Sequence, residues 1–334
     1  MIVAIKKAIL HILDSTHRMP MLSEKELDIS DAMINTFITR HIEKVYDDAS
    51  HRNGEFMSNS GLKYHINEYR ENRMSLIELS HKIAERLFDG LCASEDGGIC
   101  DIIVCDLTID EKDVIGILKL NNKTGFTHQV IKNEEGIFNN LINHYAILPN
   151  ITQKLCEYAF IDTQNLTIRY RSAVYKTEGE RTDMFADVLL ECDYEISSRE
   201  AVNTVTKAAK RVTQENGGDI METTARIKEC VIANIEEKKD IDTTEIANHI
   251  FDGRPVMKEE FNSKMDQSSV PRRIEVNKYV AKKVTSDIKI TTDIGIELSF
   301  PAEYYRDSKY VDIINNEDGT ISIRINNIGE IINK

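Results

Sequence analysis

The sequence has no tryptophan, and aromatic residues make up only 7% of its 334 positions. It therefore offers few side chains that could stack on the unpaired bases of a single strand. No apolar stretch approaches the roughly 18 residues that a membrane span needs. The N-terminal segment MIVAIKKAILHIL has two lysines inside its apolar run and no small-residue cleavage site, so it does not resemble a signal peptide. These absences predict a cytoplasmic protein that does not contact a membrane.

The short motifs of common catalytic and cofactor sites are missing as well. The sequence contains no glycine-rich loop ending in Gly-Lys-Ser/Thr, no GxGxxG after a strand, no GxSxG and no HExxH. None of the six cysteines belongs to a CxxC pair, and isolated cysteines in apolar surroundings are usually buried in the core of proteins from a reducing compartment. We therefore expect no catalytic residue, no metal and no cofactor, and we expect the cysteines to be buried.

The sequence has the composition of a globular protein and a large net negative charge. Hydrophobic residues make up 41% and charged residues 29%, which suits a folded protein with a full core. The formal net charge is −14, and residues 1–150 and 151–334 each contribute −7. Because the acidity is spread evenly along the chain, any binding surface for a polyanion has to be a local concentration of lysine and arginine.

The first 180 residues predict a domain of helices and a mostly antiparallel sheet. Ser75 and Glu78 have the spacing of a capping box, which marks the start of a helix. The strands are expected to be antiparallel because their connections are too short for helical crossovers. The expected elements are a strand at 2–13, a helix from near Ser30, a loop or weak helix at 50–73, a helix at 75–91, and five or six strands between 99 and 175.

Residues 181–334 predict a helical region with β-hairpin elements at its C-terminal end. Ser197 and Glu200 form a second capping box. The expected helices are at 184–192, 198–216, 219–239, 242–251, 257–265 and 271–284, followed by strand-like segments at 287–300 and 310–325 with a turn at 316–319. The whole chain is therefore predicted to be α+β, with two domains, 1–180 and 181–334.

Two segments concentrate positive charge within this acidic chain. The segment SSVPRRIEVNKYVAKKV at 268–284 carries five Lys/Arg residues and one Glu, and TKAAKR at 206–211 carries three Lys/Arg residues. On helices, cations three and four residues apart share a face and can neutralise several phosphates together. A solvated helix face is the alternative interpretation of the same pattern. The candidate DNA-binding residues are Arg272, Arg273, Lys278, Lys282, Lys283, Lys207, Lys210 and Arg211.

A metal-dependent nuclease is a less favoured interpretation of the segment CDIIVCDLTIDEKDVIGILKL. Asp101 or Asp113 followed by Lys119 has the outline of a two-metal site built on adjacent strands. The position two residues before the lysine is Ile117, so the site has too few oxygen ligands for a hard cation. A lone lysine near the end of an apolar strand is more often an edge residue whose amine reaches solvent, and this is the reading that we adopt for Lys119.

Three stretches of the chain resemble the bacterial nucleoid-associated protein family, the 37-kilodalton nucleoid-associated proteins. They are IKKAILHILD at the start, the helix SLIELSHKIAERLF, and the C-terminal block from PRRIEVNKYVAKKV through GIELSFPAEYY to DGTISIRINNI. No single stretch is a strong motif, and the resemblance depends on their succession over almost the whole chain. It implies association with the nucleoid and DNA binding without known catalysis.

We therefore expect a non-enzymatic DNA-binding protein of the bacterial nucleoid. Its contacts would be mainly to the phosphate backbone of double-stranded DNA, with weak sequence selectivity. An alternative is a protein-interaction module that binds DNA-processing machinery or a defence complex through the amphipathic helices of 182–266. The sequence is compatible with a homodimer, although no heptad seam argues for one.

Overall fold

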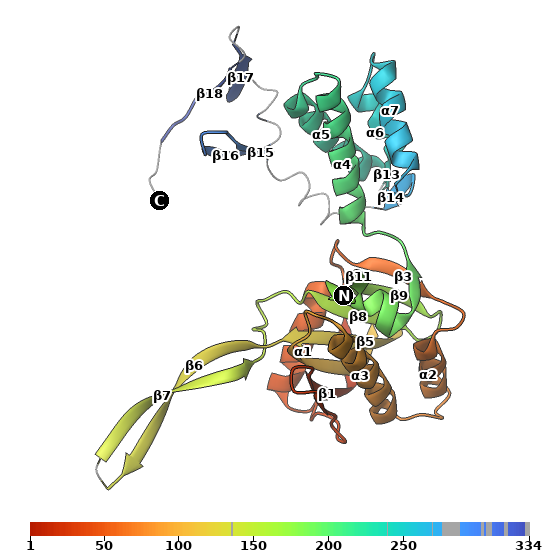
Figure 1. The fold of residues 1–334 in the computed structure, drawn as a ribbon, viewed down its shortest axis with the longest axis vertical. Helices are drawn as coiled ribbons and strands as arrows, with labels where there is room; N and C mark the ends of the chain where they lie inside the picture. Colours follow the sequence, from red (N-terminus) through yellow and green to blue (C-terminus); the bar gives the residue numbers. More distant parts are fainter. Residues whose placement is uncertain are drawn as a thin grey trace. The chain divides into compact units, whose positions relative to one another are not determined.

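The computed structural model describes residues 1–134, 136–238, 240–268, 270–275, 288–301, 304, 309–316 and 320–330. The chain divides into two compact units, Met1–Glu195 and Ile196–Lys334. The first is built on a sheet and the second mainly on helices (Figure 1). The chain is thus α+β, as the sequence predicts.

The first unit combines three α-helices, one π-helix and twelve strands. Its elements are β1 (Val3–Asp14), β2 (Met19–Met21), α1 (Ala32–Val45), β3 (Arg52–Phe56), α2 (Gly61–Arg70), α3 (Leu76–Ala93), β4 (Ile99–Ile109), β5 (Lys112–Asn121), β6 (Lys123–Asn133), β7 (Gly136–Ile147), β8 (Glu157–Asp162), β9 (Thr167–Arg171), β10 (Val174–Thr177), β11 (Glu180–Asp183), η1 (Met184–Leu190) and β12 (Cys192–Tyr194).

Eight of these strands form one sheet in the order β12-β3-β9-β8-β5-β4-β1-β2, and every neighbouring pair is antiparallel. Helix α1 packs on one face, and α2, α3 and η1 pack on the other. Because side chains alternate between faces, Val114, Leu118 and Leu120 of β5 lie in the core under α1. Ile115 and Ile117 lie in the core under α3. A strand covered on both faces is apolar at consecutive positions, which explains the unbroken apolar run in β5.

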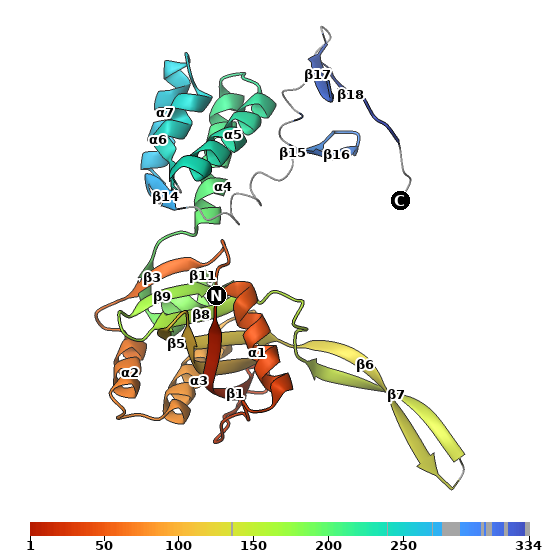
Figure 2. The same ribbon diagram turned by 180° about the vertical axis from the view of Figure 1, so that it is seen from behind.

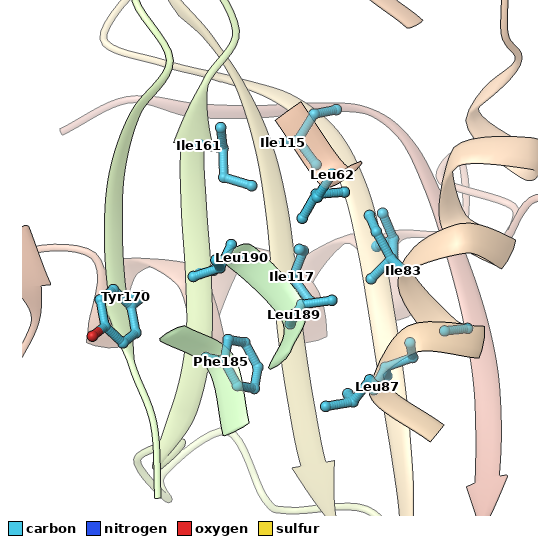
Figure 3. Close-up of a cluster of buried hydrophobic side chains, with 14 of the residues drawn as sticks. Leu62, Ile83, Leu87, Ile115, Ile117, Ile161, Tyr170, Phe185, Leu189 and Leu190 are labelled. Atoms are coloured by element: carbon cyan, nitrogen blue, oxygen red, sulfur yellow. The ribbon is translucent and has the colours of Figure 1, made fainter. Parts of the chain in front are cut away.

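The larger of the two cores lies between the sheet and the helices α3 and η1. Ile83 and Leu87 of α3 and Leu189 of η1 are fully buried over the strands (Figure 3). The capping box predicted for α3 is present, since Ser75 accepts from the backbone of Glu78 and the Glu78 carboxylate accepts from the backbone of Ser75. Burial of an apolar side chain such as Ile83, Leu87 or Leu189 stabilises the fold by about 1.5–3 kcal/mol.

Two sequence predictions for this unit need correction. Residues 50–73 contain α2, which agrees with the helical alternative, with Ser60 as its N-cap, but they also contain the strand β3, which was not predicted. Polar composition hid this strand because β3 pairs with β9 and β12 through the backbone, which the side-chain pattern does not report. Four cysteines are buried and Cys92 is half-buried, but Cys156 is exposed.

Strands β6 and β7 leave the sheet as a long two-stranded arm (Figures 1 and 2). They pair from Lys123 opposite Ile147 to Asn133 opposite Gly136. The arm is inserted between β5 and β8, which are neighbours in the sheet. It is therefore an addition to a sheet that is continuous without it.

Among its described residues, the second unit contains four helices and three short two-stranded antiparallel sheets. The buried aromatic rings of Phe251 and Phe261 contact each other in its interior, with centroids 5.8 Å apart. None of the helices within the described ranges is long and apolar enough to cross a membrane. Its elements are α4 (Ser198–Glu215), α5 (Ile220–Lys238), β13 (Asp240–Asp242), α6 (Thr243–Ile250), α7 (Pro255–Asp266), β14 (Arg273–Glu275), β15 (Ile288–Thr291), β16 (Glu297–Phe300), β17 (Val311–Asn315) and β18 (Ile321–Ile325).

The helix predicted from Pro271 is wrong at its start. Residues 273–275 form β14, which pairs with β13 so that Ile274 lies opposite Ile241, both buried. The carbonyl of Arg272 accepts from the backbone and hydroxyl of Thr243, which holds the chain extended. Tertiary pairing therefore overrides the helical pattern. Residues 276–284 of the predicted helix lie outside the described residues.

Candidate nucleic-acid interface

Helix α4 presents the first of the two predicted basic groups. The helix opens with the predicted capping box, in which Ser197 and Glu200 bond each other's backbone N–H groups. Its buried stripe is Ala201, Val202, Val205, Ala209 and Val212. Lys207 and Arg211 are exposed and Lys210 is half-buried on the side away from that stripe. The helix thus places the three cations on one face.

These three cations differ in how they are paired. No carboxylate in the part of the chain that the structure describes makes an ion pair with Lys207 or Lys210. Arg211, whose side chain is 71% exposed, donates from Nε to Oε1 of Glu215 at 2.8 Å, and Lys264 of α7 donates to Oε2 at 3.0 Å. Hydrogen bonds from Arg211 and then Lys264 lower the pKa of Glu215 to about 2. One end of the basic face is therefore neutralised by a surface network.

Arg272 and Arg273 form the second basic group, at the start of strand β14. Their side chains are 75% and 77% exposed, and the Nε of each lies 4.0 Å from a carboxylate oxygen of Asp242. Asp242 is already engaged as the N-cap of α6, where it accepts from the backbone of Thr244 at 2.8 Å. Partial burial would raise the pKa of Asp242, but the Thr244 N–H and the charge of Arg272 lower it. One capping carboxylate thus faces two arginines at the limit of ion-pair distance.

The structure places both basic groups in the same helical unit. Helix α4 packs against β14, which lies beside the N-terminal end of α4 in both views (Figures 1 and 2). Lys207 is about 14 Å further along the helix from Ser198, at 1.5 Å per residue. Lys278, Lys282 and Lys283, the other predicted contacts, lie outside the described residues.

Sequence reasoning missed a third concentration of cations, in the first unit. Asp48 is almost completely buried, and Lys154 and Arg171 contact its two oxygens at 2.5 and 3.4 Å. Arg169 lies over the ring of Tyr46 at 5.0 Å. Burial would raise the pKa of Asp48, but the hydrogen bond and charge of Lys154 lower it. Lys154, Arg169 and Arg171 are more than a hundred positions from Asp48 in the sequence, so a local charge pattern could not have predicted this cluster.

The edge-residue interpretation of Lys119 is wrong. Its side chain is only 4% exposed, and the amine donates to Glu157 at 2.5 Å, to Asn121 at 2.8 Å and to the Tyr175 hydroxyl at 2.8 Å. All three amine protons therefore have an acceptor. Burial would lower the pKa of Lys119, but the Glu157 carboxylate raises it overall. This lysine is a buried structural cation.

The strand register also separates the residues of the possible two-metal nuclease site, Asp101, Asp113 and Lys119. Asp101 pairs with Leu120, which lies on the α1 face of the sheet, whereas Lys119 pairs with Ile102 on the α3 face. Asp113 lies six residues from Lys119 along β5, roughly 20 Å away, and binds Lys6 at 2.6 Å. Among the described residues, no group of three or more His, Cys, Asp or Glu is arranged to hold a metal.

A cleft of about 570 Å³ lies between α2, α3 and η1 in the first unit. Both signs of charge meet in it, because Lys82 and Arg86 stand beside Glu85, Asp89 and Asp187. Burial, followed by the charges of Lys82 and Arg86, lowers the pKa of His65 at its edge. A mixed lining of this kind does not favour a polyanion, so the basic groups of the second unit are the better candidate interface.

The chain was compared with protein families and with curated proteins. The family model NA37, described as nucleoid-associated protein YejK, matches residues 9–332, which is nearly the whole chain. The comparison with curated proteins gives no match.

Proposed function

We propose that the chain, which belongs to the NA37 family of nucleoid-associated proteins, binds double-stranded DNA directly through phosphate contacts of its second unit. The contacting residues would be Lys207, Lys210 and Arg211 of α4, Arg272 and Arg273 beside β14, and Lys278, Lys282 and Lys283 of the same basic segment. No catalytic step is part of this proposal, and it locates the protein on the nucleoid in the cytoplasm.

The observation that supports it is the exposure of Lys207, Arg211, Arg272 and Arg273. Lys207 has no described carboxylate partner, and Arg272 and Arg273 share one carboxylate at 4.0 Å. Exposed ion pairs contribute only about 0–1 kcal/mol, so little is lost when a phosphate replaces the carboxylate. Each phosphate contact also releases condensed counterions from DNA, which is a further gain for binding.

The net charge of −14 does not prevent such binding. At physiological salt the Debye length is about 8 Å, so charges on distant surfaces are largely screened from a bound phosphate. The local balance decides the contact, and residues 271–289 carry six Lys/Arg and two Asp/Glu. Backbone contacts of this type position the protein on the duplex without reading bases, which predicts weak sequence selectivity.

The test is a fluorescence-anisotropy titration of a labelled DNA duplex at several salt concentrations. The variant carries Lys207→Glu, Lys210→Glu, Arg272→Glu and Arg273→Glu. The matched control carries Lys25→Glu, Lys63→Glu, Lys112→Glu and Lys176→Glu, four lysines of the first unit with similar exposure. Both proteins have the same net charge, so only the position of the change differs.

If these residues make roughly four to six phosphate contacts at one time, the wild type and the control should bind with a slope of log affinity against log salt of about −4 to −5. In the four-site variant the slope should shrink by about 3 to 4, because each lost phosphate contact removes roughly 0.9. Equal binding by variant and control would show that the site is elsewhere. If the wild type binds DNA only in the presence of another protein, the chain is an interaction module and the proposal is wrong.

A further inference from the structure

The arm formed by β6 and β7 is a two-stranded ribbon that pairs with no other described strand. Figures 1 and 2 show it extending away from the body of the first unit. An isolated hairpin is marginally stable in water, because each strand has only one hydrogen-bonding neighbour and its side chains have little to pack on. A ribbon of this length is therefore expected to lie against another surface in the functional protein.

One face of the arm carries five large apolar side chains that are strongly exposed, while Ile131 and Phe138 on the opposite face are less exposed. Side chains that stand directly opposite each other in the ribbon share a face, and the register pairs Phe126 with Asn143, His128 with Leu141, and Lys132 with Ile137. The large apolar residues of this face, with their exposed fractions, are Phe126 (73%), Val130 (58%), Ile137 (67%), Leu141 (71%) and Tyr145 (74%). We call this set the apolar arm face. Its members are too close together to be scattered surface hydrophobics.

The arm is also the part of this acidic chain with little charge. Residues 124–131 and 136–147 contain no Asp, Glu, Lys or Arg, while the chain as a whole has a net charge of −14. Two copies of the chain repel each other over most of their surfaces. They can approach along residues 124–131 and 136–147 without bringing like charges together.

We propose that the apolar arm face is a dimerisation surface, on which the same face of a second copy of this chain docks. A two-fold axis makes such a contact self-complementary, because each apolar face meets its own copy. Two stacked ribbons form a small sandwich with its apolar side chains inside, at the usual spacing of about 10 Å between sheets.

The area of the apolar arm face suits this occupant. An aromatic side chain buries roughly 150–250 Å² when covered, so five side chains, two of them aromatic, bury on the order of 600 Å² per copy. A standard interface buries roughly 800 Å² per partner, so the ribbons and their flanking atoms approach the required size. The inference is independent of DNA binding, but a dimer would carry two DNA interfaces and bind DNA more tightly by avidity.

Sedimentation equilibrium of the full chain tests the proposal, at concentrations of roughly 1 to 50 µM, the range in which a micromolar interface assembles. The disruptive variant is Leu141→Asp with Tyr145→Asp. The matched control is Gln129→Asp with Asn140→Asp, which adds the same charge to the opposite face of the same ribbon. A third variant, Leu141→Ala with Tyr145→Ala, separates lost packing from added charge.

The wild type and the control should be dimers, while the dissociation constants of the Asp and Ala variants should rise at least about 100-fold, as expected for two central interface residues. Circular dichroism and unfolding midpoints equal to those of the control would show that the variants are folded. A monomeric wild type would overturn the proposal. So would a dimer that survives both the Asp and the Ala variants, or one that the opposite-face control weakens equally.

Discussion

The two units of this chain differ in where their charged side chains lie. In the first unit, Lys119 and Glu157 meet with side chains 4% and 2% exposed, and the Asp48 carboxylate is 1% exposed between Lys154 and Arg171. In the second unit, the side chains of Arg211, Arg272 and Arg273 are 71–77% exposed. Exposed ion pairs such as Lys82–Glu85 occur in the first unit as well. The contrast is therefore between the two clusters around Glu157 and Asp48, which the fold encloses, and the three arginines of the second unit, which face solvent.

Burial decides what each kind of pair can do. A buried ion has lost its hydration, so its partner cannot leave without a large free-energy penalty. An exposed ion is hydrated whether or not it is paired, so a phosphate can replace its carboxylate at little cost. The buried pairs at Glu157 and Asp48 therefore stabilise the fold, whereas the exposed cations of the second unit are available to a ligand. Four comparisons of a variant with the wild type test this difference.

The largest effect is expected for Lys119→Met, which leaves the Glu157 carboxylate buried without its cation. Breaking one side of a buried ion pair destabilises a protein by about 3–5 kcal/mol. The free energy of unfolding, measured by urea denaturation of the first unit's transition, should fall by that amount. The double variant Lys119→Met with Glu157→Leu should recover a large part of the loss, since no buried charge remains. A loss below 1 kcal/mol in the single variant would show that the pair behaves like an exposed one.

The next effect concerns Asp48→Asn, which keeps the shape of the side chain and removes its charge. The loss of charged hydrogen bonds to Lys154 and Arg171 should lower the unfolding free energy by about 1–3 kcal/mol at neutral pH. Because folding lowers the pKa of Asp48, its contribution is present above the unfolded pKa near 4 and is lost as pH falls through the folded pKa. The difference between wild type and variant should therefore stay constant down to about pH 5 and shrink as the pH falls below about 4. A difference independent of pH would exclude the carboxylate charge as its cause.

A smaller effect, on binding rather than stability, is expected for Lys207→Gln with Lys210→Gln. Affinity for duplex DNA should fall roughly threefold to tenfold at physiological salt, and the salt slope should shrink by about 2. The unfolding midpoint should stay unchanged, because the helix buries its other face. A drop in stability without a change in DNA affinity would reverse the roles that we assign to the two units.

The smallest effect is expected for Glu215→Gln, which releases Arg211 and Lys264 from their shared carboxylate. If α4 binds phosphates, DNA affinity should rise by about twofold to threefold, because Arg211 no longer has to give up the Glu215 carboxylate when it binds a phosphate. Stability should change little at neutral pH. Because the carboxylate has a pKa of about 2, both proteins should keep the same relative affinity down to about pH 5. A decrease in DNA affinity would argue against Arg211 as a contact.

Sequence reasoning succeeded where the interactions are local. The capping boxes at Ser75 and Ser197 are formed as predicted, because a helix cap joins residues three positions apart. It failed at β14 and at Lys119, whose partners Ile241 and Glu157 are more than thirty positions away. The DNA-contact assignment remains a prediction for all eight residues, including the three outside the described range.

By itself the sequence determined the α+β class, the capped helices, the spread of acidity and the presence of two basic segments, since composition and short-range spacing are enough for these. Only the tertiary structure decided that Lys119 is enclosed, that Asp101 faces the other side of the sheet, that Arg272 and Arg273 stand exposed at the start of β14, and that five large apolar side chains share one uncovered face of the arm. The physical reason is that strand register joins distant residues, and burial sets whether a charge holds the fold or meets a partner.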